Sequence, residues 1–377
     1  MSKLFRFARL LCWLLVLPSV PAAAAQDCEV DGVAVNPFNG HGIAGRSGLM
    51  RCVDHDTGQL LREQELSGGK QVGLVRVYRN GKPVLEYQID DKGRRDGRAR
   101  EFSESGQVLR DETYVDGRAT GIGITYYPDG RLKRVAAYGP AGLEEAFVQY
   151  GDQGLLTDIR CADRPVLGSV VDDARLCGHR GKVSVVNLYL PGGVLHAKVS
   201  YLAGKRLQMS TYWPDGKLST ETEFGPPERR ERSYAESGVR IREERWARQG
   251  DTLVKESEQL FHETTGVMTS ERRWLDGQLA VERTFYLNGS PRRTSTYQYE
   301  GDVQTVTVED FYDDGTPAAQ GSYVITRRQD RLPTGVHRQY DRSGRLRAEA
   351  TYDNAGRLQS VHEWPDGAPP EAGTVQK

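Results

Sequence analysis

Few residues in this sequence have the types and spacing that catalysis or metal binding requires. Gly45-Arg46-Ser47-Gly48 departs by one residue from a nucleophile elbow and follows no strand-like run, so we expect a loop. Asp54-His55-Asp56 could ligate a metal ion, but Thr57-Gly58 follow at once and are typical of a hairpin tip. A solvated turn is therefore the favoured interpretation of this triplet.

Acidic pairs and histidines elsewhere form no recognisable site. Asp172-Asp173 and Asp313-Asp314 are expected to be turn or loop acids. The sequence has no HExxH, P-loop or Rossmann glycine run. His262 is expected to pack in an aromatic slot of the repeat described below. The histidines are scattered along the chain: His41, His55, His179, His196, His262, His337 and His362. The sequence therefore predicts a chain that is not an enzyme, with no catalytic residues, no cofactor and no metal site.

The amino terminus predicts export. Three basic residues precede an apolar run at 10–20: Lys3, Arg6 and Arg9. Small residues at Ala23-Ala24-Ala25 suit signal peptidase, so residues 1–25 are interpreted as a signal peptide. Cys28 is not preceded by a lipoprotein box, so we expect soluble export, with a retained membrane anchor as the alternative. The predicted location is periplasmic or secreted.

The cysteines fit an oxidising compartment. Cys12 lies in the predicted leader, which leaves Cys28, Cys52, Cys161 and Cys177. An even number in an exported chain favours structural disulfides, and the local pairs Cys28–Cys52 and Cys161–Cys177 are preferred among three connectivities. A zinc site is the alternative, but no CxxC or HxxxH spacing supports it.

The composition favours turns and half-buried strands. Of the 377 residues, 27% are charged and 37% hydrophobic, and the chain contains 42 glycines and 18 tyrosines. The formal charge is −1, and removing the three basic leader residues makes it −4. Because nucleic-acid binding needs a basic excess, we expect no nucleic-acid partner.

Aromatic residues recur at fixed distances from turn glycines, four residues before or eight after. The turn glycines of this register include Gly106, Gly130, Gly193, Gly216, Gly289, Gly315 and Gly344. The aromatic ladder comprises Tyr114, Tyr126, Tyr138, Tyr201, Tyr212, Phe224, Trp246, Trp274, Tyr297, Tyr323, Tyr340, Tyr352 and Trp364. A second glycine often falls midway, so that one turn occurs about every dozen residues and one repeat spans about 22 to 25.

Within each repeat the residues alternate with a period of two. After Gly344, one strand face carries Leu346, Ala348, Ala350 and Tyr352, and charged or polar residues lie between them. This pattern predicts a half-buried antiparallel strand rather than a helix. The predicted fold is all-β, an elongated antiparallel β-meander of tandem hairpins that forms a twisted single-layer sheet.

These units resemble the MORN repeat, and more closely its bacterial variant. The pattern of a glycine, an aromatic pair, an acidic or Asn-Gly turn, a leucine and a later tyrosine occurs at 121–132 and 335–346. The resemblance covers roughly 55–160 and 183–367. The units of Gly238 and Gly315 depart from it, because charged or unusual residues replace the expected leucine, and we expect them to be irregular or bulged.

The repeat pattern divides the mature chain into segments. We expect an N-terminal cap at 26–54, a first half-array at 55–160, a disulfide-closed insertion at 161–182 and a second half-array at 183–367. Residues 368–377 are interpreted as a disordered tail. Whether the array is one continuous sheet or two halves stays open.

Two surfaces have both a structural and a binding interpretation. Mixed charges at 228–232 and 242–245 are typical of a solvated sheet face, or they form a surface for a charged partner. The aromatic ladder is either the core or, in part, a docking face, because a single-layer sheet leaves one face uncovered.

Three functions are compatible with such an array. The resemblance implies a protein-binding module, with an antitoxin- or immunity-like role against a toxin or effector. The alternative is a cell-envelope scaffold or adaptor that binds wall or outer-membrane components. Lipid headgroup binding is claimed for some eukaryotic MORN proteins, but the slight acidity of the mature chain argues against it.

Overall fold

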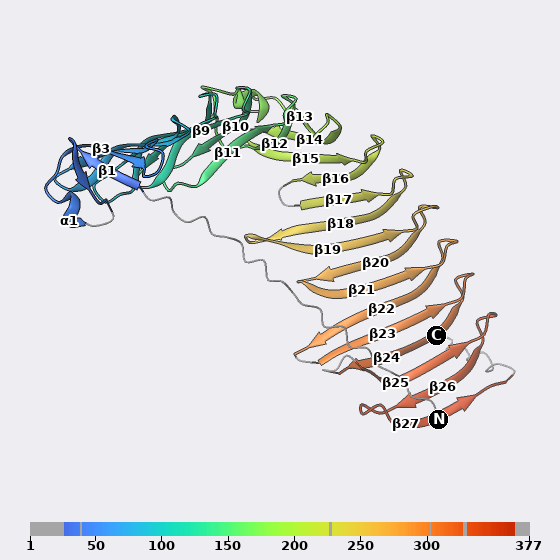
Figure 1. Cartoon of the computed structure of the whole chain (residues 1–377). Coiled ribbons are helices and arrows are strands. Elements are labelled where there is room, and N and C mark those ends of the chain that lie inside the picture. The colour runs from blue at the N-terminus through green and yellow to red at the C-terminus, as the bar shows by residue number, and fades with distance from the viewer. Residues whose placement is uncertain (1–25, 38–39, 226–227, 302, 327–329, 366–377) are drawn as a thin grey trace, which may run out of the picture. The chain divides into compact units, whose positions relative to one another are not determined.

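The computed structural model describes residues 26–37, 40–225, 228–301, 303–326 and 330–365 (Figure 1). The predicted signal peptide at 1–25 and the predicted tail at 368–377 lie outside these residues. Among the described residues, no helix is long and apolar enough to cross a membrane.

Strands β1 to β12 form the first sheet, in which β1 lies between β2 and β3 and the later strands follow in chain order. A short helix, α1 (Gly40–Ile43), separates β2 from β3. The strands are β1 (Gln26–Val30), β2 (Val33–Val35), β3 (Gly48–Asp54), β4 (Leu60–Ser67), β5 (Lys70–Arg79), β6 (Lys82–Ile89), β7 (Arg95–Phe102), β8 (Val108–Val115), β9 (Arg118–Tyr126), β10 (Leu132–Tyr138), β11 (Glu144–Tyr150) and β12 (Leu156–Arg160).

Strands β13 to β27 form a second, 15-stranded sheet in strict chain order. Figure 1 shows them side by side, joined by turns at alternate edges. The strands are β13 (Ser184–Tyr189), β14 (Leu195–Leu202), β15 (Lys205–Tyr212), β16 (Leu218–Phe224), β17 (Glu228–Tyr234), β18 (Arg240–Gln249), β19 (Thr252–Phe261), β20 (Met268–Leu275), β21 (Gln278–Phe285), β22 (Pro291–Glu300), β23 (Val303–Phe311), β24 (Pro317–Ile325), β25 (Arg331–Tyr340), β26 (Leu346–Tyr352) and β27 (Leu358–Glu363). The predicted all-β meander is confirmed, and it consists of two open sheets rather than one.

The chain also divides into two compact units. One comprises Met1–Leu132 with Ala137–Glu144, and the other comprises Lys133–Ala136 with Glu145–Lys377. Strands β11 and β12 therefore group with the second sheet, although they belong to the first.

The turns have the chemistry that the sequence indicates. In the turn after β9, the Gly130 N–H donates to the Tyr127 carbonyl at 2.9 Å, and the Tyr127 N–H donates to the Arg131 carbonyl at 2.8 Å. Gly130 has a φ of +86°, which a residue with a Cβ rarely adopts. The Asp129 carboxylate accepts the Arg131 N–H at 3.0 Å. These local bonds close the hairpin and set the register of the strands beside it.

Strand pairing in the second sheet separates two faces. Ala197 pairs with Thr211 and Val199 with Met209, so these side chains lie on the face that carries Tyr201. We call this the aromatic face and the opposite one the reverse face. Pairing extends the aromatic face to Thr220, Thr222, Phe224, Arg242, Glu244, Trp246, Ser270, Arg272, Trp274, Arg293, Ser295, Tyr297, Ala319, Gly321, Tyr323, Ala348, Ala350 and Tyr352.

The Gly315 unit contains the irregularity expected there. The pairing of β24 with β25 shifts between Gln320 and Ser322, on either side of Gly321. The His337 ring packs over Gly321, where an added Cβ would approach the ring nitrogen Nδ1 to 2.4 Å. The same ring makes edge contacts with Tyr323 and Tyr352. Position 321 of the aromatic face is therefore a glycine, because the His337 ring occupies the space that a larger side chain would need.

The N-terminal segment has its own small core. Cys28 pairs directly with Cys52 across β1 and β3, and the two form a disulfide. The surrounding buried cluster contains Val30, Ile43, Met50 and Leu66 as well as both cysteines. An apolar cluster and a covalent link thus close the first end of the array.

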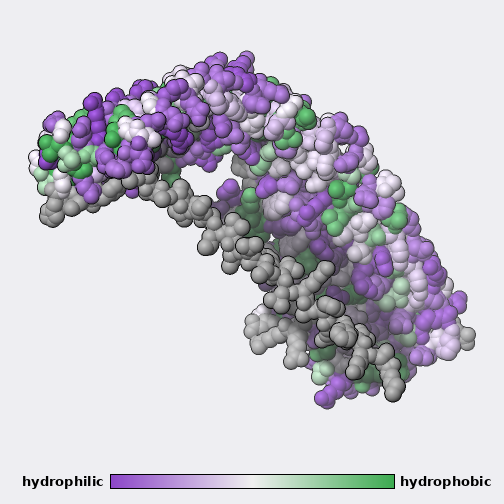
Figure 2. Space-filling model, in the orientation of Figure 1, coloured by the Kyte–Doolittle hydropathy of each residue, from purple (hydrophilic) through white to green (hydrophobic). Residues whose placement is uncertain are grey.

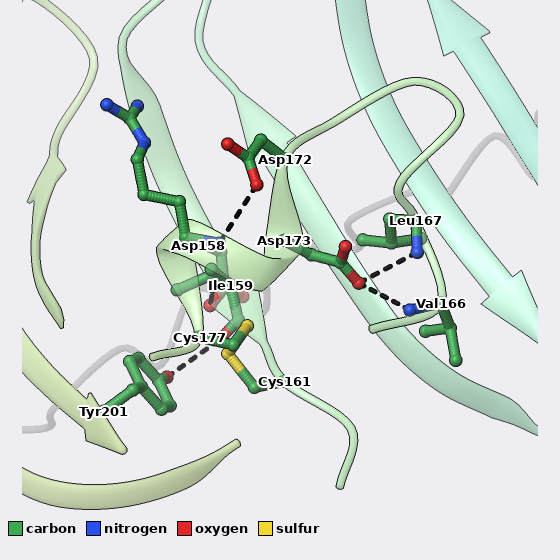
Figure 3. Close-up of a disulfide and its surroundings, with 10 residues drawn as sticks. Asp158, Ile159, Cys161, Val166, Leu167, Asp172, Asp173, Cys177 and Tyr201 are labelled. Carbon is green, nitrogen blue, oxygen red and sulfur yellow. Dashed lines mark hydrogen bonds between the residues drawn. A yellow bond between two sulfur atoms is a disulfide. The ribbon is translucent and has the colours of Figure 1, made fainter. Parts of the chain in front are cut away.

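The 161–182 segment is closed by the Cys161–Cys177 disulfide and contains helix α2 (Asp173–Leu176) (Figure 3). The buried Asp173 carboxylate accepts the N–H groups of Val166 and Leu167 at 2.7 and 2.8 Å. Its neighbour Asp172 caps the helix by accepting the Arg175 N–H. Both predicted disulfides are therefore present, and the two acids organise the second disulfide loop.

The disulfide loop packs on the hairpin of β14 and β15. The Gly204 and Ala203 N–H groups donate to the Cys177 and Gly178 carbonyls at 2.9 and 3.1 Å. The Tyr201 hydroxyl donates to the Ile159 carbonyl of β12, next to the loop, at 3.4 Å. An added Cβ at Gly204 would meet the Ala162 carbonyl oxygen at 1.9 Å, so only glycine fits this approach. The loop thereby covers the first strands of the second sheet.

Candidate functional site

The N-terminal residues that could do chemistry make local structural contacts. The Ser47 hydroxyl accepts the Gly68 N–H at 2.9 Å. Hydrogen bonds from the Thr57 hydroxyl and N–H to the Asp54 carboxylate lower the pKa of Asp54. The His55 Nδ1 lies 2.8 Å from an Asp27 carboxylate oxygen. These contacts are typical of a hairpin tip, as expected from the sequence.

The acidic pair Asp313-Asp314 also makes local structural contacts. Asp313 forms an ion pair with Arg342 at 2.6 Å, and Asp314 accepts the Thr316 N–H at 2.9 Å. Both acids therefore stabilise turns, and these hydrogen bonds and the Arg342 charge lower the pKa of each. Within the described part of the chain, no group of three His, Cys, Asp or Glu residues could hold a metal ion.

The expectation for His262 is wrong. Phe261 ends β19 and pairs with Met268, which places Phe261 in the aromatic slot. His262 begins the turn instead, and its Nδ1 accepts the N–H groups of Thr264 and Thr265 at 3.4 and 3.3 Å. The bond from the His262 N–H to the Val267 carbonyl closes a turn that is one residue longer than the turn at Tyr127–Arg131 and has the same length as the turn at Asp54–Gln59. The extra turn residue therefore shifts the aromatic position of the repeat from His262 to Phe261.

The aromatic ladder is the main candidate surface, and the structure separates it into two rows. The residues eight positions after each turn glycine lie on the aromatic face of the second sheet, from Tyr201 to Tyr352. Tyr212 and Tyr340 follow Thr211 and Gln339, which lie on the aromatic face, so strand alternation places both tyrosines on the reverse face.

Burial varies along the aromatic row. Tyr201 is 2% exposed, whereas Phe224, Trp246, Trp274, Tyr297, Tyr323 and Tyr352 are half-buried. In the view of Figure 2, hydrophilic residues cover most of the visible surface of the second sheet, and hydrophobic residues form scattered patches. The aromatic row is thus part core and part accessible surface.

Charged residues occupy the aromatic face between Trp246 and Trp274. Glu244 pairs directly with Glu258, and both are less than a tenth exposed. Arg242 bonds to both carboxylates, and the Lys255 ammonium lies 2.5 Å from Glu244 and 3.7 Å from Glu258. Two cations therefore bridge two neighbouring carboxylates, which would repel each other if unpaired.

The reverse face carries a second ionic cluster around Glu243, which is 4% exposed. Arg240 and Arg245 contact its carboxylate at 2.6 and 2.9 Å, and Arg230 and Arg232 lie at 3.5 and 3.7 Å. Burial alone would raise the pKa of Glu243, but the hydrogen bond from Arg245 and the surrounding arginine charges outweigh it and lower the pKa. On both faces of these strands, buried carboxylates therefore form ion pairs with arginines whose aliphatic segments pack over the sheet.

The first sheet contains a ladder of alternating charge across its strands. Strand pairing places Glu29, Arg51, Glu63, Arg76, Glu86, Arg100 and Asp111 in successive directly opposed positions. Glu86 is contacted by Arg76 at 2.9 Å and by Arg100 at 2.6 Å. The sequence shows the charges, but only the register shows that they alternate across strands.

In several turns the residue after the strand-ending aromatic residue is aromatic too. This second aromatic residue makes a hydrogen bond that the spacing in the sequence did not reveal. Trp213 donates its indole N–H to the Tyr234 carbonyl at 3.2 Å. Tyr286 and Tyr312 donate hydroxyl bonds to the Phe311 and Tyr340 carbonyls at 2.9 and 2.8 Å. Each donor lies three residues before a turn glycine, and each acceptor ends a strand two strands further on. These second aromatic residues therefore tie successive turns together along one edge.

The described residues line several cavities on the sheets. In the first unit, a groove of about 810 Å³ is lined by Val77, Leu85, Phe102, Leu109 and neighbouring residues of the turns. In the second unit, a pocket of about 340 Å³ is lined by Phe224, two leucines and four cations, among other residues.

Comparison with known families matches two of the hairpins. Residues 95–116 and 333–354 match the family model described as MORN repeat variant. These segments correspond to β7–β8 and β25–β26, each a complete hairpin with its turn. These two segments are therefore similar to the MORN repeat variant. Antiparallel pairing of neighbouring strands continues a hairpin architecture through both sheets.

Comparison with other proteins adds no functional information. No curated protein matches the chain. The crystal structure of TcdB2-TccC3-Cdc42 aligns with 82% of this chain at 9% identity and a TM-score of 0.18, and this chain covers 18% of that one. A protein of unknown function from Bacteroides fragilis aligns with 50% of this chain and 97% of its own length, at 11% identity and a TM-score of 0.10. At these TM-scores neither likeness bears on fold or function.

Proposed function

We propose that this chain is a non-catalytic, exported repeat protein that binds a protein partner through its second sheet. The observation that carries this proposal is the half-buried aromatic row on the aromatic face. Among the described strands from β16 to β27, each packs substantially only against its neighbours in the sheet. Accessible aromatic side chains beside arginines are the residue types that dominate protein interfaces.

Export is part of the proposal. The leader-like residues at 1–25 and the disulfides Cys28–Cys52 and Cys161–Cys177 support a periplasmic or extracellular location, because such bonds persist in oxidising compartments. The MORN-type repeats are compatible with an antitoxin- or immunity-like role, in which stoichiometric binding neutralises a toxin or effector. Membrane lipid and nucleic acid are not proposed as partners.

The test is an affinity capture from the periplasm of the producing cell. Tagged mature protein is crosslinked mildly, purified and examined by mass spectrometry. One stoichiometric protein, toxic when expressed alone and harmless when expressed with this chain, supports the neutraliser role. Capture of wall or outer-membrane components instead supports an envelope scaffold. If nothing is captured above the level of an unrelated exported protein, the binding function is refuted.

A further inference from the structure

The pocket of about 340 Å³ on the second sheet combines an apolar floor with a cationic rim. Leu207, Phe224 and Leu253 line the floor. Arg248 and Leu253 are directly paired across β18 and β19, and Phe224 pairs with Arg229 across β16 and β17. The pocket therefore lies on the aromatic face, at the ends of the strands that carry Phe224 and Trp246.

The cations of the rim differ from the other cations of this region. Every arginine from Arg229 to Arg283 forms an ion pair except Arg248, and all residues of this range are described. Lys205 and Arg206 also form no ion pair with any described residue. The lining contains one carboxylate, that of Glu228, so its formal charge is clearly positive. Three exposed cations without ion-pair partners surround this pocket.

Two guanidinium groups are already held in place by aromatic rings. The Arg206 guanidinium lies 5.4 Å from the centre of the Phe224 ring. Arg229 lies 5.8 Å from the same ring and 5.0 Å from that of Trp246, and it bonds to Glu231 at 2.7 Å. The buried Nε of Arg229 has no hydrogen-bond partner. Arginines fixed in this way lose little conformational entropy when they bind a carboxylate.

We propose that this pocket binds an acidic peptide segment of a protein partner, in which an apolar side chain is flanked by carboxylates. This inference rests on the proposed function and names the site and the chemistry of its partner. The apolar anchor would cover Phe224 and Leu253, and the flanking carboxylates would pair with Lys205, Arg206 and Arg248. The acidity of the mature chain as a whole disfavours an extended anionic lipid surface as the occupant, because such a surface would face more of the chain than this pocket.

The test uses the full mature protein and fluorescence anisotropy. The probe is a labelled heptapeptide with a central leucine and three acidic residues on each side. Two further peptides replace the leucine by serine or all acids by their amides. The variant Lys205→Glu/Arg248→Glu reverses two rim charges, and Leu253→Ser removes an exposed part of the floor. The matched control is Arg345→Glu/Arg357→Glu, which reverses two exposed arginines without ion pairs elsewhere in the same sheet.

The acidic leucine peptide should bind, and both altered peptides should bind more weakly. The double rim variant should weaken binding about tenfold or more, because like charges would face each other, and Leu253→Ser should weaken it about threefold. The control variant should bind as the unmodified protein does. Equal binding by the rim and control variants, or no saturable binding of the acidic peptide, overturns the inference. So does flotation with phosphatidylglycerol vesicles that depends on Lys205 and Arg248 while the peptide does not bind.

The periplasmic capture separates this inference from the proposed function. If the rim variant captures the same partner as the unmodified protein, the binding function holds and the pocket is not its site. If the unmodified protein captures nothing while the peptide binds with the expected charge dependence, the pocket recognises acidic peptides and the proposed function is wrong.

Discussion

Two regions of the second sheet complete the aromatic face with different chemistry. Strands β13 and β14 bury Val186, Leu188, Ala197, Val199 and Tyr201. Strands β17 to β20 use the equivalent positions for glutamates and for the cations that bridge them. Both regions keep the same strand pairing and the same turn chemistry. The backbone repeat therefore tolerates either apolar or ionic side chains on this face.

The surroundings of each region explain which kind of side chain it carries on this face. The disulfide loop and the end of β12 contact β14 and the turn that follows it, and side chains beneath such contacts gain most from being apolar. The ionic region has no such cover, so long arginine stems pack over the carboxylates while their charged ends stay in water. Ion pairs at a partly hydrated surface avoid the full cost of burying a charge.

The largest difference is expected when one aromatic residue is truncated in each region. Tyr201→Ala should cost about 3–5 kcal/mol of unfolding free energy, because it removes a fully buried ring. Trp246→Ala should cost less, about 1–3 kcal/mol, because the ring is half-buried. Urea titration combined with hydrogen exchange of peptides from β14 and β18 measures both. Equal losses would show that the two regions are not distinct.

Removal of the second disulfide should affect only the apolar region. Cys161→Ser/Cys177→Ser opens a loop with a sequence separation of 16 residues. In the chain-entropy picture such a loop contributes about 3 kcal/mol. Hydrogen exchange should increase in β13 to β15 and stay unchanged in β18 to β20. Cys28→Ser/Cys52→Ser is the control, since it should leave both regions unchanged.

Within the ionic region, the two neighbouring glutamates should differ. Glu243→Gln removes a carboxylate contacted by four arginines and should cost about 2 kcal/mol. Glu244→Gln should cost about 1 kcal/mol, because neutralising it also relieves its repulsion with Glu258. Thermal unfolding of the two variants side by side checks this order. A larger loss for Glu244→Gln would contradict the described network.

Of these two regions of the second sheet, acid should weaken the ionic one. For Glu243, Glu258 and Glu271, burial opposes ionisation, but arginine hydrogen bonds and charges outweigh it and lower each pKa. A lowered pKa in the folded state contributes stability above the ordinary glutamate value of about 4.3, and this stability is lost as the pH falls through the folded pKa.

Hydrogen exchange corrected for its intrinsic pH dependence measures this effect. Between pH 6 and pH 3, protection in β18 to β20 should fall, whereas protection in β14 should change little. Glu243→Gln should make the acid-dependent loss smaller. An equal loss of protection in both regions would contradict the assignment of these carboxylates.

The sequence alone determined the features that depend on neighbours along the chain. The period of two from Ala348 to Tyr352, the turn chemistry of Asp129-Gly130 and the local pairing of four cysteines were all predictable, because each rests on residues within one hairpin or one closed loop. Two shifts in register were not predictable: Leu346 pairs with Tyr340 of the reverse face, and the turn at His262 has one extra residue. No local pattern marks either extra residue.

Only the tertiary structure decided which distant residues meet. The bridging of Glu244 and Glu258, the role of Asp173 inside the disulfide loop and the clustering of Lys205 with Arg248 depend on which strands and turns lie side by side. In a sheet, directly opposed residues are separated in sequence by a distance that every turn and bulge can change. The repeat could therefore be derived from the chain itself, whereas its ionic clusters and its pocket required the completed pairing.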